Sequence, residues 1–459
     1  MNDLRKKVQI KELISAERNK NFEEVVIGYS EEEAVSESQR CLNCKNPMCV
    51  KGCPVNVPIP DFIEKIKERK FNEAYKIIKT ENFLPAVCGR VCPQEKQCEG
   101  NCIRNKTGDS VSIGKLERFV SDYYSVNEEN TAEKNNKKIA VIGSGPAGIT
   151  CAGELAVKGY EVTVFEALHI PGGVLSYGIP EFRLPKKIVE NEIDKIKNLG
   201  VKIITNVIIG KSMTIDDLLY DGYDSVFIGS GAGLPRIMGI PGENLKEIYY
   251  ANEFLTRVNL MKAYKKDSET PIKIGKTVTV IGGGNVAVDS ARTAKRLGAE
   301  KVFIVYRREE IPAREEEIIH AREEGIEFIL LTSPVKFIGE NGFVKAVEMV
   351  KTKLLESEKS GKKDFCEIEG SNYLFETDTV IIAAGQTSNP IISSVTPGLK
   401  IYGNGKIFAD SETNQTSIKK VYAGGDAVTG AATVISAMEA GKKAALAIDK
   451  YFKNEPETV

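Results

Sequence analysis

Eight of the ten cysteines in this 459-residue sequence fall into two short groups. The first group lies in CLNCKNPMCVKGCP and the second in CGRVCPQEKQCEGNC, and the members are Cys41, Cys44, Cys49, Cys53, Cys88, Cys92, Cys98 and Cys102. Structural zinc sites usually pair two CxxC knuckles or add histidine, but only Cys41 and Cys44 have that spacing. Compact runs in which proline follows a cysteine, as after Cys53 and Cys92, are typical of iron–sulfur ligands. The spacing therefore favours two [4Fe–4S] clusters, with zinc or structural thiols as the alternatives.

A glycine turn follows in KIAVIGSGPAGITCAGELAVKGYEVTVFE, residues 138–166, between a predicted strand and a predicted helix. In a GxGxxG turn the three glycines permit the tight bend, the approach of a pyrophosphate and close helix packing. The N-terminus of the helix attracts phosphate, and an acid at the end of the next strand accepts hydrogen bonds from a ribose. We therefore predict a dinucleotide site formed by Gly143, Gly145, Pro146, Ala147, Gly148 and Glu166.

A second glycine turn lies in KTVTVIGGGNVAVDSARTAKRLGAEKVFIVYRR, residues 276–308. Here the strand that ended in an acid in the first copy ends in two arginines. A planar, permanently charged guanidinium suits a 2′-phosphate, so NADP(H) is favoured over NAD(H). The alternative is that these arginines pair with the acidic helix expected at 314–324, on which His320 reads as solvated. The predicted binding residues are Gly282, Gly283, Gly284, Asn285, Val286, Arg307 and Arg308.

Two further glycine-rich segments are candidates for cofactor contact. AGGDA, residues 423–427, closes a strand before a long helix, where Asp426 can accept a hydrogen bond and the helix N-terminus near Thr433 can face a ring that gains electrons. PGGVLSYGIPEFRLPK, residues 171–186, reads as a tight loop with an exposed arginine and lysine. The predicted contacts from these segments, and from the strand end at TVIIAAG, are Gly172, Gly173, Val174, Gly385, Gly425, Asp426 and Thr433.

Composition narrows the class of protein. The 63 lysine and arginine residues nearly balance the 64 aspartate and glutamate residues. The chain therefore has no net positive charge that would favour binding to nucleic acid. The charged N-terminus has no apolar signal region, and no apolar run is long enough to span a membrane, which predicts a cytoplasmic protein. Disulfides rarely persist in the cytosol, which also favours metal for the clustered thiols.

These elements predict an α/β chain of three units. An α-helical iron–sulfur domain is expected at 1–130, where apolar spacing over 56–80 predicts a helix. A polar linker is expected at 126–138. Two Rossmann-like domains follow: a discontinuous FAD domain at 137–245 and 375–455, and an inserted NADP(H) domain at 246–374.

The motifs together resemble one family over nearly the whole chain. Both cysteine groups, GSGPAG, PGGVLSYGIPEFRLPK, GGGNVAVD, VYRR and AGGDA are similar to those of the small subunit of NADPH-dependent glutamate synthase. That family also includes the flavin/iron–sulfur subunit of the electron-bifurcating NADH-dependent ferredoxin:NADP oxidoreductase, sulfide dehydrogenase and the N-terminal part of dihydropyrimidine dehydrogenase. The motifs discriminate poorly among these members.

The resemblance implies FAD at the first glycine turn, with Glu166 at its ribose, NADPH at the second, and two [4Fe–4S] clusters. It implies crossed ligation, with Cys41, Cys44, Cys49 and Cys102 on one cluster and Cys53, Cys88, Cys92 and Cys98 on the other. Electrons from NADPH would pass through FAD and the clusters to a large subunit that makes glutamate from glutamine and 2-oxoglutarate, in a hetero-oligomer. The alternative is another electron-accepting flavoprotein or ferredoxin, as in the bifurcating or sulfide enzymes. No side chain is expected to act as a nucleophile or base.

Overall fold

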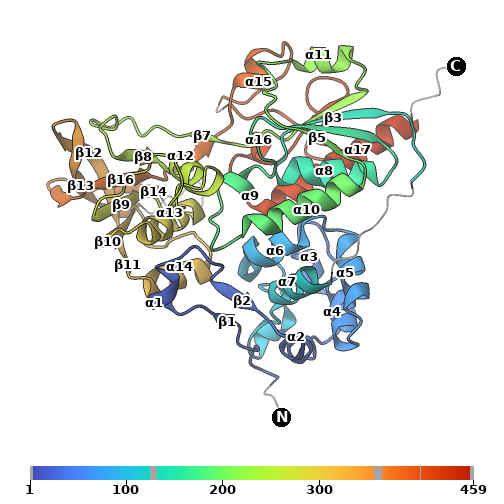
Figure 1. Cartoon of the computed structure of the whole chain (residues 1–459), viewed down its shortest axis with the longest axis horizontal. Helices are drawn as coiled ribbons and strands as arrows, with labels where there is room; N and C mark the ends of the chain where they lie inside the picture. Colours follow the sequence, from blue (N-terminus) through green and yellow to red (C-terminus); the bar gives the residue numbers. More distant parts are fainter. Residues whose placement is uncertain (1–3, 125–131, 356–363, 404, 455–459) are drawn as a thin grey trace.

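The computed structural model describes residues 4–124, 132–355, 364–403 and 405–454. Three units are visible in Figure 1: a helical domain and two domains that are each built on a parallel sheet. Residues 126–131 of the predicted linker lie outside the described residues.

The helical domain occupies residues 30–124. Its helices are α2 (Glu31–Ser38), α3 (Met48–Lys51), α4 (Ile59–Lys67), α5 (Phe71–Lys79), α6 (Pro85–Val91) and α7 (Ile113–Tyr123), with short 3-10 turns at Gln94–Lys96 and Ile103–Lys106. The helix expected over 56–80 is two helices, because the chain reverses at Arg69, whose φ is +57°. Both helices still bury one apolar face, including Phe62 and Ile66 on α4 and Tyr75 on α5.

The first sheet domain holds the first glycine turn. Its strands lie in the order β18-β6-β3-β4-β5, all parallel. The strands are β3 (Lys138–Ile142), β4 (Glu161–Phe165), β5 (Lys202–Ile204), β6 (Ser225–Ile228) and β18 (Val421–Ala423). The helices of this domain are α8 (Pro146–Ala156), α9 (Val174–Tyr177), α10 (Lys186–Asn198), α11 (Ile215–Tyr220), α15 (Ile391–Ser394), α16 (Asp426–Thr429) and α17 (Val434–Asn454). Because β18 and α17 return from the far end of the sequence, the domain is discontinuous.

The second sheet domain is inserted into the first. Its parallel strands, in the order β11-β10-β9-β16-β8, are β8 (Ile248–Tyr250), β9 (Thr277–Ile281), β10 (Lys301–Tyr306), β11 (Ile326–Leu330) and β16 (Thr379–Ile382). Its helices are α12 (Ala251–Leu255), continued by a π turn at Thr256–Leu260, α13 (Asn285–Arg296) and α14 (Glu315–Glu323). An antiparallel sheet covers it, formed by β12 (Thr332–Glu340), β13 (Phe343–Leu355), β14 (Asp364–Glu367) and β15 (Tyr373–Glu376).

The boundary expected at residue 375 falls later in the structure. β16 hydrogen-bonds to β9 and β8, so it belongs to the second sheet. The chain then returns through β17 (Gln386–Thr387), which pairs antiparallel with β7 (Leu234–Pro235). These two short strands form the crossing between the domains. Residue 375 lies within β15, and only Thr377 and Asp378 separate that strand from β16, so the sequence offers no linker that marks the boundary.

The helical domain and the first sheet domain share one hydrophobic core. Phe83 of the helical domain packs so closely on Gly153 of α8 that a β-carbon there would lie 2.8 Å from its ring. Met438 of α17 places its Sδ 3.6 Å from the sulfur of Cys88. The two domains are therefore one packing unit, and Figure 1 shows α6 directly below α10.

An N-terminal strap, residues 11–28, runs from the helical domain to the second sheet domain. It contains β1 (Lys11–Glu12), α1 (Ser15–Arg18) and β2 (Val26–Gly28), and in Figure 1 it lies between α14 and α7. Arg18 is only 2% exposed; it donates to the carbonyl of His320 and pairs with Glu323 at 2.5 Å and Glu324 at 3.0 Å. Phe22 stacks on Tyr264 with ring centroids 4.4 Å apart.

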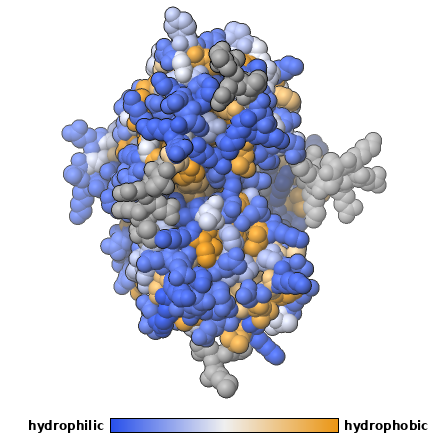
Figure 2. All heavy atoms as spheres, turned by 90° about the vertical axis from the view of Figure 1, so that its right-hand side faces the viewer, coloured by the Kyte–Doolittle hydropathy of each residue, from blue (hydrophilic) through white to orange (hydrophobic). Residues whose placement is uncertain are grey.

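Hydrophilic side chains cover most of the face in Figure 2, and apolar side chains gather there only in small separate groups. Among the residues that the structure describes, no helix is long and apolar enough to cross a membrane.

We expect Arg18→Met to loosen the strap. The change removes the Arg18 ion pairs with Glu323 and Glu324 and its hydrogen bond to the His320 carbonyl, whereas Glu324 keeps Arg292 and Arg296. We therefore expect a loss of about 1–2 kcal/mol. The midpoint of thermal unfolding should fall, and limited proteolysis should cut within residues 11–28. Lys20→Met removes an exposed cation from the same segment and is the matched control. Equal protease resistance in both variants would contradict this role of Arg18.

Candidate functional site

The first glycine turn joins β3 to α8 and opens the start of that helix. Gly143 has φ +94°, and a β-carbon at Gly148 would overlap the carbonyl oxygen of Gly143. By contrast, a β-carbon at Gly145 would meet no atom within 4 Å. The first hydrogen bond of α8 runs from Ile149 N–H to Gly145 C=O at 2.9 Å. The N–H groups before it belong to the open helix terminus, which is suited to an anion.

The segment 171–186, called the PGG loop from here on, packs directly on this turn. A β-carbon at Gly173, where φ is +55°, would lie 2.8 Å from the α-carbon of Gly145. Gly172 N–H donates to Ser144 Oγ at 2.9 Å, and the Ser144 hydroxyl donates to the buried carboxylate of Glu166. Glu166 also accepts from Leu168 N–H at 2.9 Å. This hydrogen-bond chain holds the loop, the turn and the end of β4 together.

The second glycine turn joins β9 to α13. Gly282 has φ +138°, a β-carbon at Gly283 would lie 2.7 Å from the ring of Tyr306, and one at Gly284 would meet nothing within 4 Å. Arg307 and Arg308 follow β10. Arg307 is exposed and lies 4.5 Å from the ring of Phe365. Within the described ranges neither arginine forms a salt bridge with α14, so the predicted alternative pairing is absent there.

One cavity of about 500 Å³ joins the starts of α8, α13 and α17. Of the predicted residues it is lined by Gly143, Gly145, Pro146, Ala147, Glu166, Gly173, Val174, Asn285, Val286, Asp426 and Thr433. Gly148, Gly172, Gly282, Gly283, Gly284, Gly385 and Gly425 lie in the turns around it, and Arg307 and Arg308 lie outside its wall. Sequence reasoning missed Tyr177 of α9, Asn252 and Thr256, which also line it. Burial raises the pKa of Tyr177 to about 12.

The start of α17 is the third helix terminus that lines the cavity. Asp426 accepts from Ala432 N–H at 3.2 Å, and Thr433 Oγ accepts from Ser436 N–H at 3.2 Å. Burial raises the pKa of Asp426 to about 6. The partial positive charge of the helix start favours a group that gains negative charge beside Thr433 and Val434.

The eight thiols lie in two sets. In the outer set, Cys41 neighbours Cys44 and Cys102, and Cys49 neighbours Cys41 and Cys102. Burial, with a smaller contribution from these neighbouring thiols, raises the pKa of Cys41. The same two causes raise the pKa of Cys49 to about 11. In the inner set, Cys92 neighbours Cys53, Cys88 and Cys98. These are the two sets that the resemblance implies, although the ligation itself stays a prediction.

The number of thiols in each set fits one [4Fe–4S] cluster. Among the described residues, no three His, Cys, Asp or Glu side chains lie where one metal ion could bind them all. A [4Fe–4S] cube binds its four thiolates at separate corners, which suits two sets of four spaced cysteines. Val91 and Pro93, on either side of Cys92, line the large cavity. Cys92 therefore lies between two residues of the cavity wall, although no thiol of the inner set lines the cavity itself.

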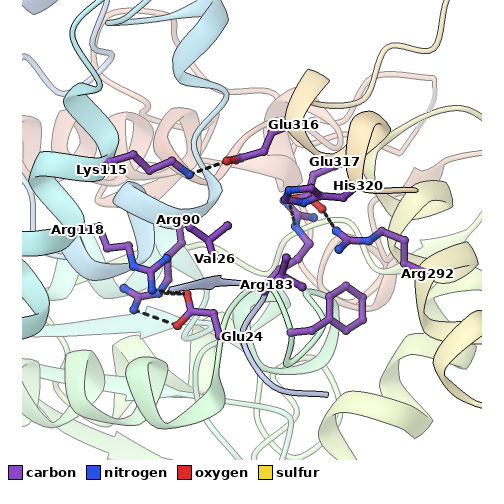
Figure 3. Close-up of a pocket in the computed structure, with 12 residues that line it drawn as sticks. Glu24, Val26, Arg90, Lys115, Arg118, Arg183, Arg292, Glu316, Glu317 and His320 are labelled. Carbon is purple, nitrogen blue, oxygen red and sulfur yellow. Dashed lines mark hydrogen bonds and ion pairs between the residues drawn. The ribbon is translucent and has the colours of Figure 1, made fainter. Parts of the chain in front are cut away.

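Buried charges join the three units at the junction in Figure 3. Arg183 Nη1 lies 2.6 Å and 2.7 Å from the two carboxylate oxygens of Asp289, and its Nε lies 3.0 Å from Glu317. Burial alone would raise the pKa of Glu317, but the guanidinium groups of Arg183 and Arg292 outweigh it and hold the pKa below its usual range. Lys115 of α7 reaches Glu316 of α14 at 2.7 Å.

This junction corrects three expectations. Arg183 and Lys186 read as exposed, but the Arg183 side chain is only 6% exposed and Lys186 is partly buried, and desolvation lowers the pKa of Lys186 to about 8. His320 is also buried, with Nε2 2.9 Å from a carboxylate oxygen of Glu12. The partners of Arg183 and His320 come from other units of the chain, so the local sequence gave no sign of their burial, whereas Lys186 donates to the carbonyls of Ile179 and Leu184 in its own loop.

Comparison with known proteins agrees with this architecture. The family described as "Dihydropyrimidine dehydrogenase domain II, 4Fe-4S cluster" matches residues 18–129, and the family described as "Pyridine nucleotide-disulphide oxidoreductase" matches residues 137–441. The chain is 36% identical over 446 residues to the glutamate synthase [NADPH] small chain of Halomonas elongata, covering 95% of this chain and 94% of that one.

The chain belongs to the family of glutamate synthase small subunits. It is also 38% identical over 432 residues to the NADP(+)-dependent formate dehydrogenase subunit beta of Moorella thermoacetica, of which it spans only 60%. The solved structure of Mycobacterium tuberculosis FprA in complex with NADPH shares the fold, with a TM-score of 0.59 and 20% identity over 69% of this chain and 85% of that one.

The protein is therefore an NADPH-dependent oxidoreductase with FAD, NADPH and [4Fe–4S] clusters as cofactors. The features that fit these groups are the open space at Gly145 and Gly284, the cavity that joins the helix starts, and the two sets of four thiols.

Two glycine substitutions separate the roles of space and packing. Gly145→Ala places a methyl group in the open space, so the chain should fold normally but bind FAD at least tenfold more weakly, equivalent to about 1.4 kcal/mol. Gly148→Ala places it against Gly143 C=O and should destabilise the fold by about 3 kcal/mol. FAD titration and thermal unfolding of the flavin-free protein measure the two effects. Normal FAD affinity in Gly145→Ala would contradict the assignment.

A cysteine substitution tests the inner set. Cys98→Ala should lower the iron content from about eight to about four atoms per chain, because one four-thiolate site loses a ligand. FAD content should stay unchanged. Cys366→Ala is the control, since Cys366 lies on β14 away from both sets. Full iron content in Cys98→Ala would remove it from the ligand list.

Proposed function

We propose that this chain oxidises NADPH and delivers the electrons to a large glutamate synthase subunit, which uses them to make glutamate from glutamine and 2-oxoglutarate. The observation that carries the proposal is the shared cavity. Its wall includes the starts of α8 and α13 and the residues on either side of Cys92. A nicotinamide site, a flavin site and an inner iron–sulfur site would thus adjoin without intervening protein layers.

The residues of the chain bind and orient the cofactors. The start of α8, Glu166 and the PGG loop would hold FAD, and the start of α13 would hold NADPH. FAD supplies the conversion between the two-electron chemistry of NADPH and the one-electron chemistry of the clusters. Val91, Pro93 and Ala437 give part of the cavity an apolar wall. Cys53, Cys88, Cys92 and Cys98 would bind the inner cluster, and Cys41, Cys44, Cys49 and Cys102 the outer one.

Disulfide exchange is a weaker candidate function, although the second matching family is named for it. The cavity wall described above contains no cysteine. Cys151 is fully buried within α8. A thiol pair beside the flavin site would be needed for exchange with a substrate disulfide.

A different acceptor is the second candidate. The similarity to a formate dehydrogenase beta subunit supports a chain of this family that works with another redox partner. The same cofactors would serve a bifurcating or sulfide-converting assembly. These alternatives share NADP(H) chemistry and differ only in the protein that exchanges electrons with the chain.

An anaerobic reconstitution distinguishes the candidates. Purified protein is mixed with NADPH, glutamine and 2-oxoglutarate, with or without the large subunit. We expect flavin bleaching in both cases and glutamate only with the large subunit. Bleaching without glutamate would overturn the glutamate synthase assignment and retain NADPH oxidation, whereas absence of bleaching would overturn both.

We also predict that Arg307 and Arg308 bind the 2′-phosphate of NADPH. Both follow β10, and a buried Nε of Arg308 has no hydrogen-bond partner within the described chain. In Arg307→Ala/Arg308→Ala, kcat/KM for NADPH should fall roughly 10- to 100-fold through the loss of charge-assisted hydrogen bonds, while that for NADH stays within about twofold. Equal losses for the two nucleotides would contradict the assignment.

A further inference from the structure

Large apolar side chains are exposed beside the outer thiols. Leu42 is 55% exposed, Met48 is 47% exposed and Ile103 is 40% exposed. Each is the sequence neighbour of a member of the outer set: Cys41, Cys49 and Cys102, respectively. An exposed apolar group that adjoins a redox centre marks a candidate protein contact, because burying it against a partner is favourable.

The two cysteine loops that carry these side chains form one face. A β-carbon at Gly52 would lie 2.6 Å from the amide nitrogen of Asn101, so the first loop packs directly on the second. Arg104 Nε donates to the carbonyl of Arg40 at 2.7 Å. Lys67 Nζ donates to the carbonyl of Cys41 at 3.2 Å. We call residues 41–53 and 100–107 the outer-cluster face.

The outer-cluster face is basic, although the whole chain has a formal net charge of −1. Its residues include Lys45, Lys51, Arg104 and Lys106 and no acid. Lys45, Lys51 and Lys106 are exposed. The N-terminal segment adds cations beside it, since Lys7 N–H donates to Asp109 at 3.1 Å and Asp109 N–H donates to Arg5 C=O at 2.8 Å. Two acids flank this face in the sequence. Asp109 is exposed, and Glu99 is partly buried and accepts a hydrogen bond from Gly114 N–H at 3.0 Å.

We propose that the outer-cluster face docks an electron-accepting protein whose own contact face is acidic around an apolar centre. This inference rests on the proposed function, because it takes the outer thiols as the site from which electrons leave. The apolar centre would bring the two redox centres close together. The lysines would speed and orient the encounter, as complementary charge does for transient redox complexes.

A matched pair of acceptors tests the proposal. Cytochrome c is basic, and succinylation of its lysines makes it acidic while it remains an electron acceptor. Under anaerobic conditions with NADPH, the wild-type chain should reduce the succinylated form on the order of tenfold faster at low salt. The preference should shrink at high ionic strength, where exposed charges are screened. In Lys45→Glu/Lys51→Glu/Lys106→Glu the preference should reverse.

The control variant is Lys336→Glu/Lys345→Glu/Lys353→Glu. It makes the same charge change on exposed positions of β12 and β13, at the far left of Figure 1 and away from the helical domain. It should keep the wild-type preference. Iron content and NADPH-dependent reduction of menadione, a small uncharged acceptor, should match wild type in both triple variants.

Three outcomes would overturn the proposal. They are no preference in the wild type, an equal shift in both triple variants, and a face variant that leaves the preference intact while light scattering shows a dimer becoming a monomer. The last result would assign the face to a second copy of this chain. Loss of menadione reduction in the wild type would instead overturn NADPH oxidation itself, so the two failures are distinguishable.

Discussion

The buried pair of Arg183 with Asp289 fixes how the two dinucleotide-binding domains meet. Arg183 comes from the loop that packs on the first glycine turn, and Asp289 comes from the helix that begins at the second. Burying such a pair adds little net stability, but separating it would leave an uncompensated charge out of water. The pair therefore sets the relative position of the two helix starts, because any other position would separate the two charges.

The neighbouring charges extend this constraint to the whole molecule. Glu317 and Glu324 of the α14 region pair with Arg292 at one end, and Arg18 of the strap pairs with Glu324 from the other side. Arg314 donates to the carbonyl of Arg90 at 2.6 Å in the helical domain. The helical domain already shares its core with the first sheet domain, so these contacts hold all three units in one arrangement.

Local sequence patterns made much of the fold and of the candidate site predictable. The glycine turns, the strand before each and the helix after each follow from spacing alone, because only glycine fits the close approaches at Gly148 and Gly173. The crossed cysteine sets came from family resemblance, since spacing along the chain says nothing about which loop folds back on which. Arg183 and His320 were read as exposed because their burial depends on Asp289 and Glu12, which are distant in sequence. The two helices within 56–80 were read as one because Arg69 adopts a left-handed backbone that its residue type does not signal.

The contact between Cys88 and Met438 joins positions that are 350 residues apart. At synthesis rates of about 5–20 residues per second, α17 emerges on the order of tens of seconds after the inner thiols. During that interval the first sheet lacks β18, and the helical domain lacks the side of its core that α17 supplies. The core around Cys88 is therefore completed only after the last helix of the chain has been synthesised and has docked.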